Sequence, residues 1–172
     1  MRKRVATLVA VATMLAGCGG GVEGSPVAAE RWDPCSIPDE AIQATGLDPV
    51  TKDEGWSEGV VVDDWARCEY MEQDASASYA LSVLSSVDHT IAEARANSSN
   101  RGGSDLEVGG RDAYMYTTES GPGIRDCKIA LDVPPGVVVF TVLYQEDDGA
   151  DACAIGLEHV RDLEGSLPTA PN

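Results

Sequence analysis

The sequence is poor in basic residues, in aromatic residues and in long apolar runs. It has 12 Lys and Arg against 29 Asp and Glu, so the formal net charge is −17. This balance excludes a nucleic-acid-binding protein, because such a protein needs a basic face to neutralise phosphates. Aromatic residues make up only 5% of the chain. Hydrophobic residues still make up 43% of the 172 residues, which is enough for the core of one domain and argues against wholesale disorder.

Motifs typical of metal, redox and cofactor sites are also absent. H-E-x-x-H and C-x-x-C do not occur, and the chain has only two His. A zinc site and a thiol-redox site are therefore not expected. Gly19, Gly21 and Gly24 fit the pattern G-x-G-x-x-G, but no predicted strand precedes them, so they do not indicate a dinucleotide site. The sequence predicts no cofactor and no metal ligand.

Two places invite a catalytic interpretation around the His residues. Ser86, Asp88 and His89 lie close together in the chain. Residues this close at a helix start point about 100° apart per position, so they do not form a linear relay, and we interpret Ser86 or Asp88 as a helix cap. His159 is expected to face solvent or to lie at the edge of the core. No catalytic residue is predicted.

The N-terminus has the pattern of an export signal. Three basic residues at 2–4 precede an apolar stretch at 5–15 that is too short to cross a bilayer. Leu15-Ala16-Gly17-Cys18 follows, and it resembles the lipobox of bacterial lipoproteins. The resemblance implies cleavage before Cys18 and a diacylglycerol on its thiol. We therefore expect the protein at the extracytoplasmic face of the cell membrane, with the membrane as a partner through the N-terminal lipid and no nucleic-acid partner.

These features divide the chain into four parts. Residues 1–17 are the expected signal peptide, and residues 18–30 have the Gly/Ser/Pro composition of a flexible tether. Residues 31–168 are expected to form a single domain, followed by a C-terminal tail at 169–172. Because the mature domain is acidic, it should stand off anionic lipid headgroups.

The four remaining cysteines are expected to form two disulfides, since an exported chain lies in an oxidising compartment. They are Cys35, Cys68, Cys127 and Cys153, and four cysteines allow three pairings. We favour Cys35–Cys68 and Cys127–Cys153. The second pair follows from the local pattern, because Cys127 opens a predicted hairpin at the end where the last helix begins.

The hydrophobic pattern predicts an α+β fold with an antiparallel sheet and helices packed mainly on one face. Ser36 is expected to cap a helix at 37–45 that stops at Gly46, and Asp88 a helix that ends near Asn97. Residues 97–104 are expected to form a loop. Strands are predicted at 65–71, 79–85, 106–108 and 113–117, a hairpin pairs 127–133 with 137–144, and a last helix carries Cys153, Leu157, Val160, Leu163 and Leu167 on one stripe. The strand at 137–144 is apolar on both faces, so it should be central.

The order of several short motifs is similar to that in actinobacterial lipoproteins of the domain of unknown function 3558 family. The motifs are DPCS at 33–36, CEY at 68–70, VGGRDAY at 108–114, DACA at 151–154 and LP at 167–168. One departure is Tyr70, where the family often has Trp. The resemblance implies an exported domain with two disulfides and no established activity.

Acidic pairs and tryptophans are the remaining candidates for function. Asp63-Asp64 and the acidic loop at 146–151 could hold a cation, but the loop lacks the ligand order of a calcium site, and a solvated loop that complements the following helix is favoured. Trp32, Trp56 and Trp65 could line a groove, although packing around the first disulfide is favoured. The lead hypothesis is a non-catalytic binding or interaction module of unknown ligand or protein partner. The alternatives are a carrier of a lipid or small apolar ligand, and a hydrolase with a non-local acidic site.

Overall fold

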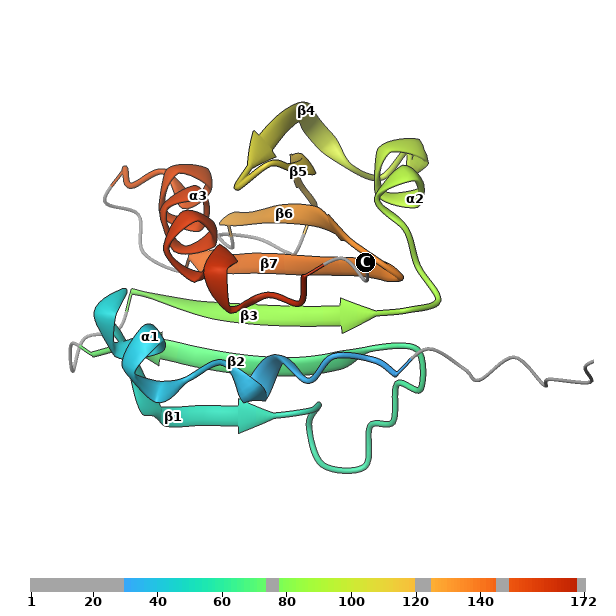
Figure 1. Cartoon of the computed structure of the whole chain (residues 1–172). Helices are drawn as coiled ribbons and strands as arrows, with labels where there is room; N and C mark the ends of the chain where they lie inside the picture. Colours follow the sequence, from blue (N-terminus) through green and yellow to red (C-terminus); the bar gives the residue numbers. More distant parts are fainter. Residues whose placement is uncertain (1–29, 74–77, 120–124, 145–148, 170–172) are drawn as a thin grey trace, which may run out of the picture.

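The computed structural model describes residues 30–73, 78–119, 125–144 and 149–169. Within these residues the chain forms a seven-stranded antiparallel sheet and three α-helices (Figure 1). The strand order is β1-β2-β3-β7-β6-β5-β4. The strands are β1 Leu47–Glu54, β2 Ala66–Glu72, β3 Tyr79–Ser86, β4 Arg101–Val108, β5 Arg111–Thr117, β6 Arg125–Val133 and β7 Gly136–Tyr144. The helices are α1 Asp39–Ala44, α2 Ile91–Ala96 and α3 Ala152–Leu163, with 3-10 turns η1 Pro34–Ser36 and η2 Glu164–Ser166.

The predicted hairpin forms the middle of the sheet. Strands β6 and β7 pair in register from Arg125↔Tyr144 to Val133↔Gly136, and β7 pairs with β3 on its other side. The structure confirms that β7 is central, and eight of its nine residues are buried, all except Leu143. An apolar side chain is needed on both faces of this strand because both are covered.

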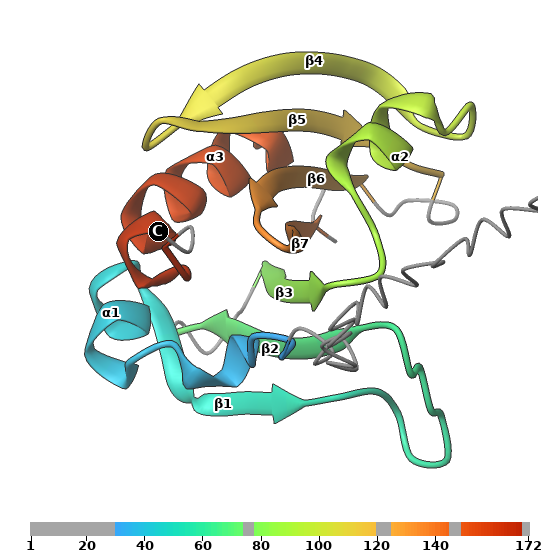
Figure 2. The same ribbon diagram turned by 45° about the vertical axis from the view of Figure 1, so that its right-hand side comes forward.

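The sheet has one face with a large core and one face with a smaller core. On the first face, Leu81, Ile129 and Phe140 pack with Val160 and Leu163 of α3. Figure 2 shows the sheet curving around α3, with α1 beside it. Ile42 of α1 belongs to the same core.

Helix α2 lies on the opposite face. Its buried Ile91 packs with Tyr116, Ala130, Val137 and Val139. Residues 129 and 130 contribute to different cores because successive side chains of a strand point to opposite faces. The expectation of helices mainly on one face is therefore not confirmed.

Two predicted helix starts are wrong. Asp33, not Ser36, provides a cap, since its carboxylate accepts a hydrogen bond from the Cys35 amide at the start of η1; α1 begins later, after Pro38. Helix α2 is capped by Thr90 rather than Asp88. The Asp88 amide instead donates to the Ser86 hydroxyl in a turn before the helix.

Of the two edge strands, β1 was not predicted and β4 was predicted only at residues 106–108. Strand β1 contains Pro49 and several charged residues, and only Leu47 in it is buried. Strand β4 begins at Arg101, inside the segment expected to be a loop, and its first five residues are exposed. Neither strand shows an apolar alternation, because edge strands bury little.

Both predicted disulfides are present, in the pairing favoured from the sequence. Cys35 of η1 bonds to Cys68 of β2, with Cα atoms 5.2 Å apart, and Cys127 of β6 bonds to Cys153 of α3, with Cα atoms 5.0 Å apart. The first bridge fastens the N-terminal segment to the sheet, and the second fastens α3 to the same face. In the described part of the chain, no helix is long and apolar enough to span a membrane.

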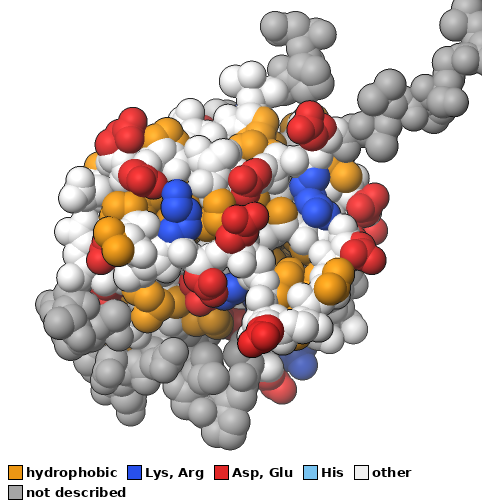
Figure 3. Space-filling view, turned by 90° about the horizontal axis from the view of Figure 1, so that it is seen from below, with side chains coloured by type: hydrophobic (Ala, Val, Ile, Leu, Met, Phe, Trp, Pro, Cys, Tyr) orange, Lys and Arg blue, Asp and Glu red, His pale blue; other side chains and the backbone are white. Residues whose placement is uncertain are grey.

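Acidic side chains are spread over the surface. On the face in Figure 3 they lie among small groups of hydrophobic side chains, with few Lys and Arg between them. The negative net charge of the sequence is therefore visible on this face without one continuous apolar patch.

Candidate functional site

Trp65 and His89 form a stacked pair between the start of β2 and the start of α2. Their ring centroids are 5.0 Å apart and their planes differ by 13°. A carboxylate lies at each nitrogen of the imidazole: Asp64 Oδ2 is 2.6 Å from Nε2, and Glu93 Oε2 is 3.2 Å from Nδ1. The four side chains thus fix one another.

The charges of this group favour a protonated imidazole. The hydrogen bond with Asp64 raises the pKa of His89 above its ordinary 6.5, partial burial opposes this, and Glu93 adds to the rise. The hydrogen bond with His89 in turn lowers the pKa of Asp64. The pKa of Glu93 is lowered first by the Thr90 backbone amide and then by His89.

The capping box at the start of α2 explains how Glu93 reaches its place. The Thr90 hydroxyl accepts a hydrogen bond from the Glu93 amide, and the Glu93 carboxylate accepts one from the Thr90 amide. The sequence carries this signal as Thr90-x-x-Glu93. Since Ile91 then anchors the helix on the sheet, the first turn of α2 stands beside Trp65.

A cleft of about 180 Å³ opens beside this pair, and we call it the α2 cleft. Helix α2, strands β5 and β7 and three loops provide its walls. Trp65, His89, Thr90, Glu93 and Ala94 line one side, Tyr116, Val137 and Val139 form the floor on the sheet, and Asn97 and Asn100 of the loop after α2 complete it. The cleft therefore has an apolar aromatic interior and a rim of mostly neutral polar groups.

His89 is not free to act as a general base in the cleft. Both ring nitrogens of His89 are engaged by carboxylates, which lie on different sides of the ring and do not converge on one point. Ser86 uses its hydroxyl in the turn to Asp88, so the group Ser86, Asp88 and His89 is not brought together as a relay. Among the described residues, no three His, Cys, Asp or Glu side chains are placed to hold a metal ion.

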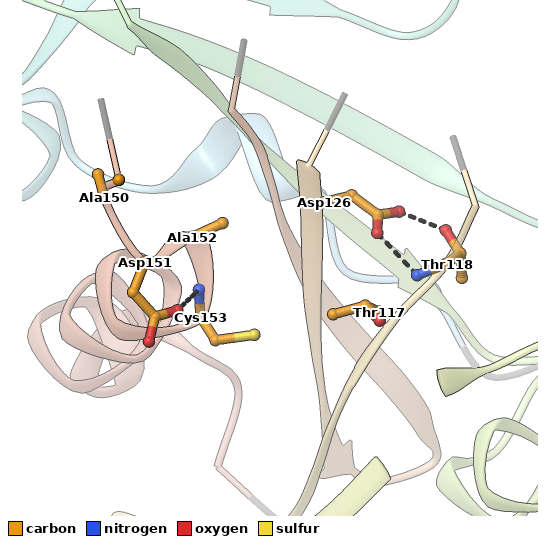
Figure 4. Close-up of a pocket in the computed structure, with 8 residues that line it drawn as sticks. Thr117, Thr118, Asp126, Ala150, Asp151, Ala152 and Cys153 are labelled. Atoms are coloured by element: carbon orange, nitrogen blue, oxygen red, sulfur yellow. Dashed lines mark hydrogen bonds between the residues drawn. The ribbon is translucent and has the colours of Figure 1, made fainter. Parts of the chain in front are cut away.

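A wider cavity of about 490 Å³ lies between the end of β5 and the start of α3 (Figure 4). Its polar groups serve the fold. The buried Asp126 carboxylate accepts hydrogen bonds from the Thr118 amide at 2.7 Å and from Lys128 Nζ at 2.9 Å. Asp151 caps α3 by accepting from the Cys153 amide at 2.8 Å. Asp151 thus complements the helix as expected, whereas residues 146–148 of the acidic loop lie outside the described residues.

Comparison with known proteins identifies one family. The family model described as "Protein of unknown function (DUF3558)" matches residues 13–166. The chain belongs to this family. No curated protein and no solved structure matches the chain. Family membership therefore adds no activity to what the geometry of the site provides.

The sequence contains one match to a serine-hydrolase pattern that the sequence predictions did not include, and the structure does not support a catalytic role for it. The segment GWSEG at 55–59 fits G-x-S-x-G. In serine hydrolases that pattern makes a sharp turn from a strand into a helix. Here it follows β1 and leads into a loop that ends at β2. Neither of the two His forms a hydrogen bond with the Ser57 hydroxyl within the described residues. The segment is a connection between two strands.

The three tryptophans do not line a common groove. Trp32 packs against the large core, and its carbonyl oxygen accepts a hydrogen bond from Ser85. Trp56 lies beside Arg67, whose guanidinium carbon is 5.7 Å from the ring centroid. Only Trp65 lines the α2 cleft.

The expectation for His159 is wrong. Its side chain is buried, with 4% of the residue exposed, and Nε2 lies 2.7 Å from the Tyr79 hydroxyl. Nδ1 is buried with no hydrogen-bond partner among the described residues. In the sequence His159 lies beside core positions of α3. The sheet covers the side of α3 on which His159 lies, so the His159 side chain is buried.

Proposed function

We propose that the chain is an exported, lipid-anchored lipoprotein of the cell envelope whose domain is a non-catalytic binding module, with the α2 cleft as its binding site. The N-terminal pattern supports the anchor: basic residues at 2–4, an apolar stretch at 5–15 and the lipobox-like segment ending at Cys18. The family match starts at residue 13 and so includes that segment.

The observation that carries the binding role is the way His89 is held. Its nitrogens are engaged by Asp64 and Glu93, so the ring serves as a fixed support for Trp65 instead of a proton donor or acceptor for a substrate. A pre-formed cleft with an apolar interior and a few polar groups is typical of a ligand site.

The pKa shifts beside the α2 cleft argue against an acidic catalyst at this place. A catalytic acid needs a carboxyl group whose pKa is raised toward the working pH. The pKa values of Asp64, Glu93 and Asp112 are all lowered from their ordinary values. These groups stay ionised and serve as hydrogen-bond acceptors.

Photo-crosslinking in intact cells tests the binding role. A benzoylphenylalanine at Asn97, at the rim of the α2 cleft, is expected to capture a small envelope molecule that appears as a mass adduct on the intact protein. The control position is Val50 on β1, which is 88% exposed and far from the cleft in the sheet order. Equal adducts at both positions, or none at Asn97, would contradict the proposal.

A further inference from the structure

The polar groups of the α2 cleft that have no partner are neutral. Asn97 accepts a hydrogen bond from the Ser99 amide through Oδ1, and its side-chain NH₂ has no partner among the described residues. Asn100 donates from Nδ2 to the Ala94 carbonyl, which leaves its side-chain oxygen available. The Tyr116 hydroxyl also has no hydrogen-bond partner in the described part, and burial raises the pKa of Tyr116 to about 12, so it stays protonated.

The charged groups of the cleft are already paired. His89 is engaged by Glu93 and by Asp64, and Glu93 also accepts a hydrogen bond from the Thr90 amide. A cationic ligand would have to compete with these contacts. An anionic ligand would meet the Glu93 carboxylate, which lines the cleft, in a chain of net charge −17. The cleft therefore favours a neutral ligand.

The size and the apolar surface limit the ligand further. A volume of about 180 Å³ lies below the range of about 300–1,000 Å³ that is typical of sites for drug-sized ligands. This is room for one small ring and not for an acyl chain. The indole of Trp65 and the side chains of Val137 and Val139 offer apolar contact to one side of such a ring, while the amides and hydroxyl face polar groups on its edge.

The α2 cleft lies near the place where the N-terminal segment enters the domain, and this position indicates where a ligand would come from. The Arg31 guanidinium donates to the Asp63 carbonyl at 2.6 Å, so the chain enters the domain next to Asp64 and His89. Arg31 lies thirteen positions after Cys18 in the sequence. A stretch of this length spans at most about 45 Å. If Cys18 is the anchor, the cleft lies within reach of the membrane surface.

We propose that the α2 cleft binds a neutral sugar ring, exposed on a glycan or glycolipid near the membrane surface. This inference rests on the proposed function and names its ligand class. A sugar ring combines a C–H face for Trp65 with hydroxyl groups that accept from Asn97 and Tyr116 and donate to Asn100.

Chemical-shift titration of the full chain carrying Cys18→Ala tests the ligand class. Glucose, galactose, mannose and N-acetylglucosamine are the neutral probes; glucosamine and glucuronate are the cationic and anionic ones. We expect at least one neutral sugar to shift the amide signals of Asn97, Asn100 and Tyr116 and the Trp65 indole signal, with glucuronate causing no shift. Stronger binding of glucosamine than of every neutral sugar, or no response to any sugar, would overturn the inference.

Two variants test the assigned contacts. Trp65→Ala is expected to weaken binding about tenfold, the loss of roughly one aromatic contact, while Trp56→Ala leaves it unchanged. Asn97→Ala, at an exposed position, keeps the test valid if Trp65→Ala does not fold. If Trp65→Ala and Asn97→Ala both bind with the affinity of the parent chain, the inference is also overturned.

A further comparison separates the sources and the two proposals. Vesicles that carry a glucosyl diacylglycerol should bind more tightly than free glucose if the ligand is a glycolipid, and soluble oligosaccharides should bind more tightly if it is a glycan. If sugars fail but the probe at Asn97 still captures a small molecule in cells, the sugar inference is wrong and the binding module stands. If both fail, the binding role is wrong.

Discussion

Replacing His159 with Leu is expected to remove most of the dependence of stability on pH just below pH 6.5. Burial lowers the pKa of His159 below its ordinary 6.5, and Asp162, Glu158 and Glu72 only partly oppose this effect. Within the described residues its side-chain hydrogen-bond partner is the Tyr79 hydroxyl, so a protonated ring would lie in the core without a carboxylate from this part of the chain in hydrogen-bond contact.

The sign and size of the effect follow from proton linkage. Between the folded pKa of His159 and 6.5 the unfolded chain binds more protons than the folded one, so the free energy of unfolding falls as the pH falls. One proton limits this slope to about 1.4 kcal/mol per pH unit. The raised pKa of His89 affects the free energy of unfolding at pH values above 6.5. The stabilisation that protonated His89 contributes is lost there as the pH rises through its folded pKa. The lowered pKa values of Asp64, Glu93 and Asp112 affect the free energy of unfolding only at pH values below the ordinary pKa values of these groups, which are 3.8 to 4.5.

Urea unfolding at a series of pH values between about 5 and 8 measures this slope. The parent chain should lose stability below pH 6.5, and His159→Leu should not. His89→Gln is the matched control, since it removes the other His and should keep the slope below 6.5. The absolute stability of His159→Leu is less informative, because the variant leaves the Tyr79 hydroxyl unpaired. Equal slopes in the parent chain and in His159→Leu would refute the reasoning.

Three further substitutions test the fold. Removing the Cys127–Cys153 bridge, which joins residues 26 apart, should lower the free energy of unfolding by about 3.5 kcal/mol in urea titrations. Gly136→Ala would place a methyl group against the backbone at the end of β3 and should cost about 1–3 kcal/mol, whereas Gly165→Ala, in open space, should be nearly neutral. Thr90→Ala should cost about 1 kcal/mol through loss of the α2 cap, and a melting temperature equal to that of the parent chain would contradict the capping role.

The central part of the sheet was predictable because its side chains alternate strongly. Cys127 to Val133 follow a period of two, and β7 is apolar except for Thr141. The edge strands β1 and β4 were not found in full, since an edge strand can be charged and exposed. The side of the sheet on which α2 packs was not predictable either, because it depends on Ile91 meeting Ala130 across the folded sheet.

The α2 cleft was the least predictable feature. Trp65, His89 and Asp64 were each noticed in the sequence, but their contact depends on the antiparallel pairing of β2 with β3 and on the turn that follows β3. Tyr116, Val139 and Asn100 carry no local signal of function. The capping box Thr90-x-x-Glu93 was the one available clue, because it places the start of α2 and with it one wall of the cleft.

Export and lipid anchoring are the central properties proposed for this protein, and the intact mass of the membrane-extracted protein tests both. The mass should be measured before and after reduction and alkylation. We expect a chain that starts at Cys18 and carries acyl mass, with four thiols that react only after reduction. An unmodified N-terminus with freely reactive thiols would contradict the account, and the cysteines would then have to be considered as reactive groups.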